Sequence, residues 1–144
     1  MDANGTSGHT WPEVVDFQAT RSVDPGPSAV SVRVRTSNPW TVIAVAGEMD
    51  ARVVPLVADL VGINAAHLVF ELREVTFMDA SGLGVLMDAQ RRAIRAGGCV
   101  RLVAPSSRAH RLLVLTRTDR VFLTFDSVAE AMASPVLAWP EPLA

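Results

Sequence analysis

The spacing of apolar residues changes several times along the chain, and each change predicts a new element. Apolar and polar residues alternate from Val30 through 31–35, which predicts a half-exposed strand, and the largely apolar run 40–46 predicts a buried one. The polar segment 36–39 between them ends in Pro39 and predicts a turn. A connection this short indicates that the two strands form an antiparallel hairpin.

Beyond the hairpin, helical and strand-like spacing alternate. Valines and leucines recur at helical spacing from 53 to 61, and Gly62 predicts the end of that helix. The other predicted strands are 67–72, 99–103 and 121–125, and the other predicted helices are 81–96, 107–116 and 128–133. Apolar strands separated by helices of this length favour parallel neighbours joined by right-handed crossovers. We therefore expect an α/β fold: one domain with a mixed sheet of about five strands and about four helices.

The two ends of the chain differ from its middle. Residues 1–28 are rich in Gly, Pro, Ser and Thr, which predicts a flexible N-terminal leader. Residues 134–144 contain three prolines and predict a C-terminal tail that cannot continue the preceding helix. The folded domain is expected to span residues 29–133.

Composition excludes several classes of function. The formal net charge of the 144 residues is -2, so the chain lacks the basic footprint of a nucleic-acid-binding protein. All 13 basic residues are arginine, which excludes any mechanism that requires a lysine of this chain. The single cysteine, Cys99, favours a reducing compartment. Without an apolar run approaching about 20 residues or a signal-peptide pattern, we expect a cytoplasmic protein that does not enter membranes.

The motifs that would indicate an enzyme are incomplete. Gly82-Leu83-Gly84 follows a predicted strand and opens a predicted helix, but Met87 occupies the third glycine position of a dinucleotide fingerprint. Ser81 lacks the flanking glycines of a nucleophile elbow, and no motif places a histidine to serve it. His and Cys residues also lack metal-ligand spacing. The expected protein is a non-enzyme that uses neither metal nor cofactor.

The segment 77–86 carries the most specific local signal. It predicts the end of a buried strand, a tight turn and the start of a helix. Asp79 and Ser81 would then lie at the positive end of the helix dipole, on a surface that a partner can reach. A purely structural interpretation remains open, in which Ser81 caps the helix and Asp79 accepts hydrogen bonds from loop amides. Gly82 and Gly84 would allow another backbone to approach closely.

Helical spacing assigns two faces to the helix after this turn. The predicted core-facing stripe consists of Leu83, Leu86, Met87 and Ile94. The predicted outer face near the first turn consists of Ser81, Gly84, Val85 and Asp88.

The turn resembles a family signature. Asp79-Ala80-Ser81-Gly82-Leu83-Gly84 is similar to the Asp-Ser-Ser-Gly-Leu-Gly or Asp-Ser-Thr-Gly-Leu-Gly of STAS domains, the anti-sigma factor antagonists. Gly47-Glu48-Met49-Asp50 is similar to the Gly-Glu-Leu-Asp of the same family. Weaker similarities at 97–98, 104–106 and 112–116 extend the resemblance over about residues 30–133.

The resemblance implies a function in transcription regulation. Such a protein binds an anti-sigma factor, usually a serine kinase of the GHKL type, and makes it release its sigma factor. The chain would act as a monomer or weak dimer. The implied partner-binding residues are Asp50, Asp79, Ala80, Ser81, Gly82, Gly84, Val85 and Asp88.

One residue departs from the signature. In the family, the kinase phosphorylates the serine after the turn aspartate, and the added charge would disrupt docking beside Asp79. Ala80 occupies that position here and has no hydroxyl group. Three hypotheses follow. The antagonist is not switched by phosphorylation, which we favour; Ser81 is phosphorylated instead; or the chain is a STAS scaffold or small-ligand-sensing module with another partner, its ligand near Asp50 and Asp79.

Overall fold

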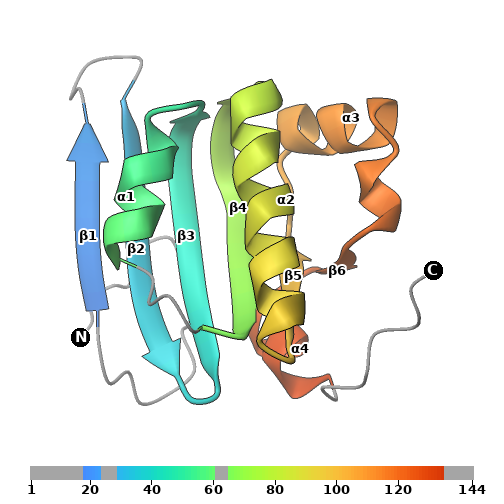
Figure 1. The fold of residues 1–144 in the computed structure, drawn as a ribbon. Helices are drawn as coiled ribbons and strands as arrows, with labels where there is room; N and C mark the ends of the chain where they lie inside the picture. The colour runs from blue at the N-terminus through green and yellow to red at the C-terminus, as the bar shows by residue number, and fades with distance from the viewer. Residues whose placement is uncertain (1–17, 24–28, 61–64, 135–144) are drawn as a thin grey trace.

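A six-stranded mixed sheet organises the described part of the chain, residues 18–23, 29–60 and 65–134, in this computed structural model (Figure 1). The strands follow one another across the sheet in chain order: β1 (Gln18–Val23), β2 (Val30–Ser37), β3 (Trp40–Met49), β4 (His67–Met78), β5 (Cys99–Val103) and β6 (Leu123–Phe125). β2 and β3 form the expected antiparallel hairpin, and each pair from β3–β4 to β5–β6 is parallel. The predicted fold class is confirmed.

The sheet contains one strand more than expected. β1 lies inside the predicted N-terminal leader and pairs antiparallel with β2, in a register that places Gln18 opposite Arg35 and Val23 opposite Val30. The sequence of β1, QATRSV, has no apolar alternation, so its strand state depends on β2 as a partner. The rest of the predicted leader and residues 135–144 of the predicted tail lie outside the described residues.

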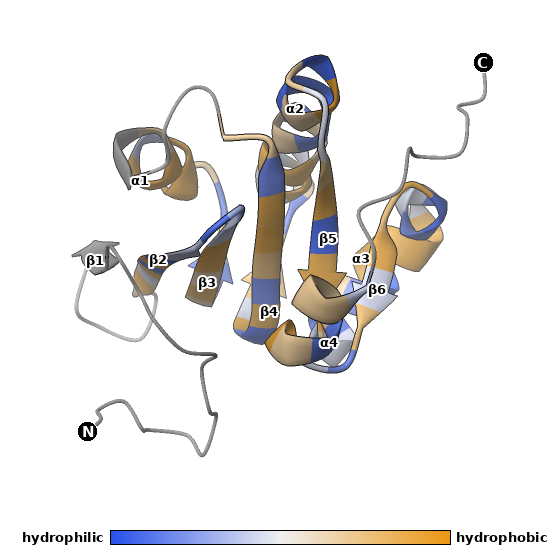
Figure 2. Cartoon of the chain, turned by 90° about the horizontal axis from the view of Figure 1, so that it is seen from below, coloured by the Kyte–Doolittle hydropathy of each residue, from blue (hydrophilic) through white to orange (hydrophobic). Residues whose placement is uncertain are grey.

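Within the described residues, four α-helices cover the two faces of the sheet. They are α1 (Val53–Leu60), α2 (Ala80–Arg95), α3 (Ser107–Leu115) and α4 (Val128–Ala133), with a short 3-10 helix at Thr118–Arg120. α1 and α2 lie on one face of the sheet, and α4 lies on the other (Figures 1 and 2). Gly62, the predicted end of α1, lies outside the described residues.

The strand β4 runs six residues beyond the predicted end at Leu72. Toward the end of the strand, each buried residue is separated from the next by a pair of exposed ones, with Val75 and Met78 buried. The β3–β4 pairing shifts register between Ala44 and Ala46 and between Gly47 and Glu48, and each shift places one extra residue on β4. The spacing of three is not the strand period of two, which explains why periodicity ended the strand at Leu72, although segment 77–86 was expected to begin with the end of a buried strand.

Each face of the sheet carries its own apolar core. The larger core fills the space between the sheet and α1, α2 and α3, with Ile43, Phe70, Leu86 and Leu102 among its fully buried side chains. The smaller core lies under α4 and contains Trp40, Val42, Val69, Val103, Val128 and Ala131. Apolar residues accordingly dominate the central strands in Figure 2.

A buried cation fixes α4 to the second face. Arg101 is 2% exposed, and its Nη1 donates hydrogen bonds to the carbonyl oxygens of Ala131 and Ser134, at 2.5 and 2.9 Å. Its guanidinium carbon lies 4.7 Å from the ring centroid of Trp40 and 5.5 Å from that of Phe125. Carbonyls at a helix C-terminus and aromatic faces both favour a positive charge, so Arg101 compensates for its burial.

Candidate functional site

The turn between β4 and α2 begins with an aspartate cap. Asp79 is extended, and its Oδ1 accepts hydrogen bonds from the backbone N–H groups of Ser81 (2.9 Å) and Gly82 (3.1 Å). The helix therefore starts at Ala80, and the expectation that Ser81 caps it is wrong. A carboxylate is as good a cap as a hydroxyl and gains further from the positive end of the helix. Ala80 and Ser81 both remain exposed on the first turn.

Gly82 holds this turn against the end of β3. Gly82 is buried, and a Cβ added to it would overlap the carbonyl oxygen of Met49. Met49 also pairs with Met78 in the parallel β3–β4 register. Asp50 and Asp79, which follow these two methionines, therefore leave the sheet at the same edge. The structure thus brings together the two segments on which the sequence prediction depends. The expected close approach is confirmed at Gly82, whereas a Cβ at Gly84 would meet nothing within 4 Å.

Asp50 is fixed by Arg52. Its Oδ1 accepts from the backbone N–H and the Nε of Arg52 at 3.0 and 2.9 Å, and its Oδ2 accepts from Nη2 at 3.0 Å. Glu48 forms an ion pair with the same arginine, and its Oε1 lies 3.7 Å from Arg52 Nη2. The hydrogen bonds from the Arg52 side chain lower the pKa of Asp50, with smaller contributions from the Arg52 backbone N–H and charge and an opposing effect of burial. Asp50 therefore presents an ionised carboxylate whose direction is set.

Helix α2 is rotated relative to the predicted stripe. Val85, assigned to the outer face, is 9% exposed and packs into the core, whereas Ile94, assigned to the core, is 49% exposed. The side chain that periodicity could not place is Gln90, which is 4% exposed. Its Oε1 accepts from Val100 N–H at 2.9 Å, and its Nε2 donates to the carbonyl oxygen of Val121 at 3.2 Å. A polar residue satisfied in this way can occupy a core position.

The rest of the predicted outer face does reach solvent. Gly84 is exposed, and Asp88 is half-exposed, with 49% of its side chain accessible. Asp88 Oδ2 lies 3.0 Å from Arg92 Nε, and its Oδ1 lies 3.4 Å from Arg91 Nη2. Of the predicted partner-binding residues on α2, Gly82 and Val85 are buried and pack against the rest of the domain. The others form the accessible surface.

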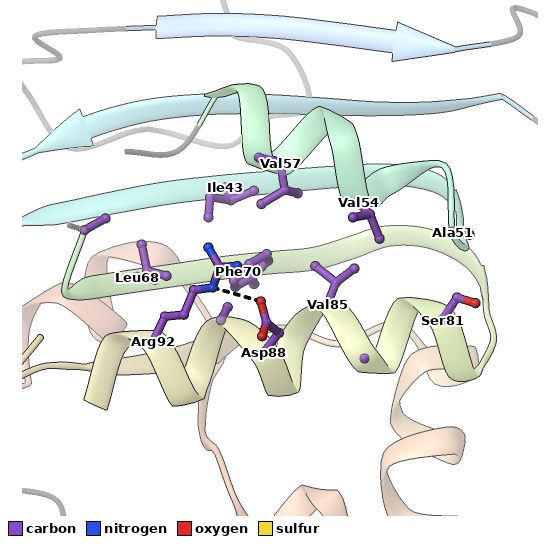
Figure 3. A pocket seen from close by; sticks show the side chains of 14 residues that line it. Ile43, Ala51, Val54, Val57, Leu68, Phe70, Ser81, Val85, Asp88 and Arg92 are labelled. Carbon is purple, nitrogen blue, oxygen red and sulfur yellow. Dashed lines mark ion pairs between the residues drawn. The ribbon is translucent and has the colours of Figure 1, made fainter. Parts of the chain in front are cut away.

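A groove lies beside this surface, between α1 and α2 (Figure 3). Its volume is about 560 Å³, and its floor is formed by Ile43 of β3 and by Leu68 and Phe70 of β4. Valines and alanines supply most of the walls, and the polar contributions are Ser81, Asp88 and Arg92 of α2. The sequence pattern does not predict this groove, because the groove depends on how far apart two helices pack. The only signal was the set of small residues at facing positions, Ala58 on α1 and Gly84 and Ala89 on α2.

Metal binding and membrane crossing both lack a candidate among the described residues. Within them, groups of three or more His, Cys, Asp or Glu residues that could hold a metal ion are absent. Across the same part of the chain, each helix is too short or too polar to cross a membrane.

The fold and the turn define a class. The parallel β3–β4 pair, followed by an Asp-capped helix that packs on the end of β3, forms the centre of a small α/β domain. The family model of the STAS domain matches residues 30–131, so the chain belongs to the STAS domain family.

Curated relatives share more sequence with this chain than the solved structures do. A Thermotoga maritima protein named "Putative anti-sigma factor antagonist" is 35% identical over 71 residues, which are 49% of this chain and 61% of that protein. A homologue from Thermotoga neapolitana is 34% identical over a match of the same length and coverage. The match thus spans less than two thirds of these relatives.

Solved structures agree with the fold. An anti-sigma factor antagonist from Mycobacterium paratuberculosis superposes with a TM-score of 0.65 at 22% identity, covering 75% of this chain and 95% of that one. The unphosphorylated anti-sigma factor antagonist SpoIIAA gives a TM-score of 0.57 at 17% identity, covering 79% and 93%. At these identities the likeness establishes the shared fold.

The packing of Gly82 predicts opposite effects for two neighbouring glycines. Gly82→Ala should destabilise the protein by about 1–3 kcal/mol, because its methyl group overlaps the Met49 carbonyl. Gly84→Ala is the matched control: it meets open space and should stabilise by up to about 1 kcal/mol through helix propensity. Urea unfolding of the two variants measures both changes. Equal effects would contradict the close approach.

The Arg52 hydrogen bonds predict a pH dependence. In Arg52→Gln the pKa of Asp50 should rise toward its ordinary value, measured by NMR titration of the carboxyl carbon. Because folding lowers this pKa, the associated stabilisation is present above the unfolded-state pKa and disappears as the pH falls through the folded-state value. The stability difference between wild type and Arg52→Gln should therefore shrink on acidification. Arg91→Gln, on α2, should leave the Asp50 titration unchanged.

Proposed function

We propose that this protein is an anti-sigma factor antagonist. It binds an anti-sigma factor through the exposed surface of the β4–α2 turn and the neighbouring Asp50, and binding frees a sigma factor for transcription. The observation that carries this proposal is the juxtaposition of the two acidic segments, enforced by Gly82 on Met49, within a STAS domain. Relatives named as anti-sigma factor antagonists support the same role. We propose that the protein acts in the cytoplasm and without catalytic activity.

The proposed partner is a serine kinase of the GHKL type, toward which this antagonist is not switched by phosphorylation. Ala80 is the first residue of α2 and is exposed, so a serine there would be accessible, but alanine offers no hydroxyl group. Ser81 is the competing hypothesis. Because Asp79 provides the cap, the Ser81 hydroxyl is not needed to start the helix, and only the direction of its side chain disfavours Ser81 as the phosphorylated residue. Successive helical residues point about 100° apart.

Recovery of the partner tests the proposal. The immobilised full chain should retain an anti-sigma factor with a GHKL kinase domain from the cytosol of its own organism, and added chain should release the sigma factor from that complex. Ala80→Glu should weaken binding at least about tenfold, because it places a second negative charge beside Asp79 in the interface. Ala129→Glu, an exposed alanine in the first turn of α4, is the matched control and should bind normally. Retention of a larger assembly without a sigma factor would instead favour the STAS scaffold.

Restoring the hydroxyl tests the phosphorylation hypothesis. With the recovered kinase and ATP, Ala80→Ser should incorporate phosphate at residue 80, whereas the wild-type chain should incorporate none. Mass spectrometry locates the site. Phosphate on the wild-type chain that disappears in Ser81→Ala would contradict the proposal and assign the switch to Ser81.

A further inference from the structure

The groove between α1 and α2 has the dimensions and chemistry of a small-molecule site. Its volume, about 560 Å³, lies within the usual range for such pockets, which extends from about 300 to 1,000 Å³. The floor is apolar, and Val54 at the rim is 50% exposed although it is a large hydrophobic residue. An apolar ligand would cover this valine together with the half-buried Val57 and the exposed Ala58, and burial of this apolar surface would provide the driving force.

The polar groups of the groove are placed asymmetrically. Ser81, Asp88 and Arg92 all come from α2, whereas α1 contributes Val54, Val57 and Ala58. Asp88 is shared between two guanidinium groups, those of Arg91 and Arg92, so this cluster carries a net positive charge. The Arg92 side chain is 61% exposed and retains donors for a further acceptor. Figure 3 shows Arg92 with Leu68 toward one end of the groove and Ser81 at the other.

The length of the groove favours an elongated ligand. Ser81 and Arg92 line it from positions about 16 Å apart along α2, at 1.5 Å per residue. A molecule with a long apolar body would extend over Phe70 and Val54, and one anionic head group would meet Arg92.

We infer that this groove binds a small amphiphile, with an apolar chain along its floor and a carboxylate or similar anion at Arg92, and that the bound ligand excludes the anti-sigma factor. The second half rests on the proposed function. Ser81, Gly84 and Asp88 belong both to the groove and to the proposed docking surface, so one occupant obstructs the other. Ligand binding would thus regulate an antagonist that has alanine, without a hydroxyl group, at the position that the family phosphorylates.

Dodecanoate, below its micelle concentration, is the test ligand. It should bind the wild-type chain with a dissociation constant on the order of 10–100 µM, as expected for about 14 non-hydrogen atoms of modest efficiency. Binding is measured by calorimetry and by amide NMR shifts, which should concentrate on α1, α2 and β4. Dodecanol, with the same chain and no charge, should bind about fivefold more weakly.

Two pairs of variants locate the ligand. Arg92→Gln should abolish the preference for dodecanoate over dodecanol, whereas Arg95→Gln, an exposed residue outside the groove lining, should retain it. Val54→Asp should weaken both ligands at least tenfold. Its control is Val114→Asp on α3, where the valine is 45% exposed, and this variant should bind both normally. Absence of binding, or equal binding by Val54→Asp and Val114→Asp, would overturn the groove as the site.

A competition experiment tests whether the bound ligand excludes the anti-sigma factor. Dodecanoate should release the anti-sigma factor from the wild-type chain, but not from Val54→Asp, which leaves the proposed docking residues intact. Binding in the groove without release would refute the exclusion of the partner. Failure to retain any anti-sigma factor, with normal dodecanoate binding, would refute the proposed function and leave the ligand site standing.

Discussion

The close packing of Gly82 on the carbonyl of Met49 is the constraint on which the proposed site depends. A helix can approach the end of a neighbouring strand this closely only where a side chain is missing. The contact sets the position of α2 relative to β3, and therefore the position of the turn relative to Asp50. It also fixes one wall of the groove, because the same helix carries Gly84, Asp88 and Arg92 along its length.

The opposite face of the sheet serves to hold α4. There Arg101 binds the end of α4 through two carbonyls and lies against Trp40 and Phe125. This buried arginine belongs to the interior, whereas Asp50, Asp88 and Arg92 on the α1–α2 side are at least partly exposed. The packing under α4 and the proposed recognition surface between α1 and α2 are thus separated by the thickness of the sheet, and substitutions on one side have little direct contact with the other.

Local periodicity predicted most of the fold, because a hairpin and alternating helices and strands leave their spacing in the sequence. The features that it missed depend on residues distant in the chain. β1 needs β2 as a partner strand, and the last part of β4 depends on two register shifts in its pairing with β3. The resemblance located the turn and Asp50 correctly at one edge of the sheet. Helical periodicity could not show that Gln90 is buried and Ile94 exposed, since the hydrogen bonds that satisfy Gln90 come from Val100 and Val121 in later segments.

Because Asp79 caps the helix, neighbouring positions of the turn differ in how well they tolerate substitution. Asp79 starts the helix and supplies charge to the surface, so altering it for recognition also costs helix stability. Ala80 lies between this cap and the close contact at Gly82, with its side chain exposed and outside both. Residue 80 can therefore vary with little effect on folding. Under the proposed function, one substitution at residue 80 would therefore add or remove the phosphorylated hydroxyl group, and the scaffold would tolerate either residue.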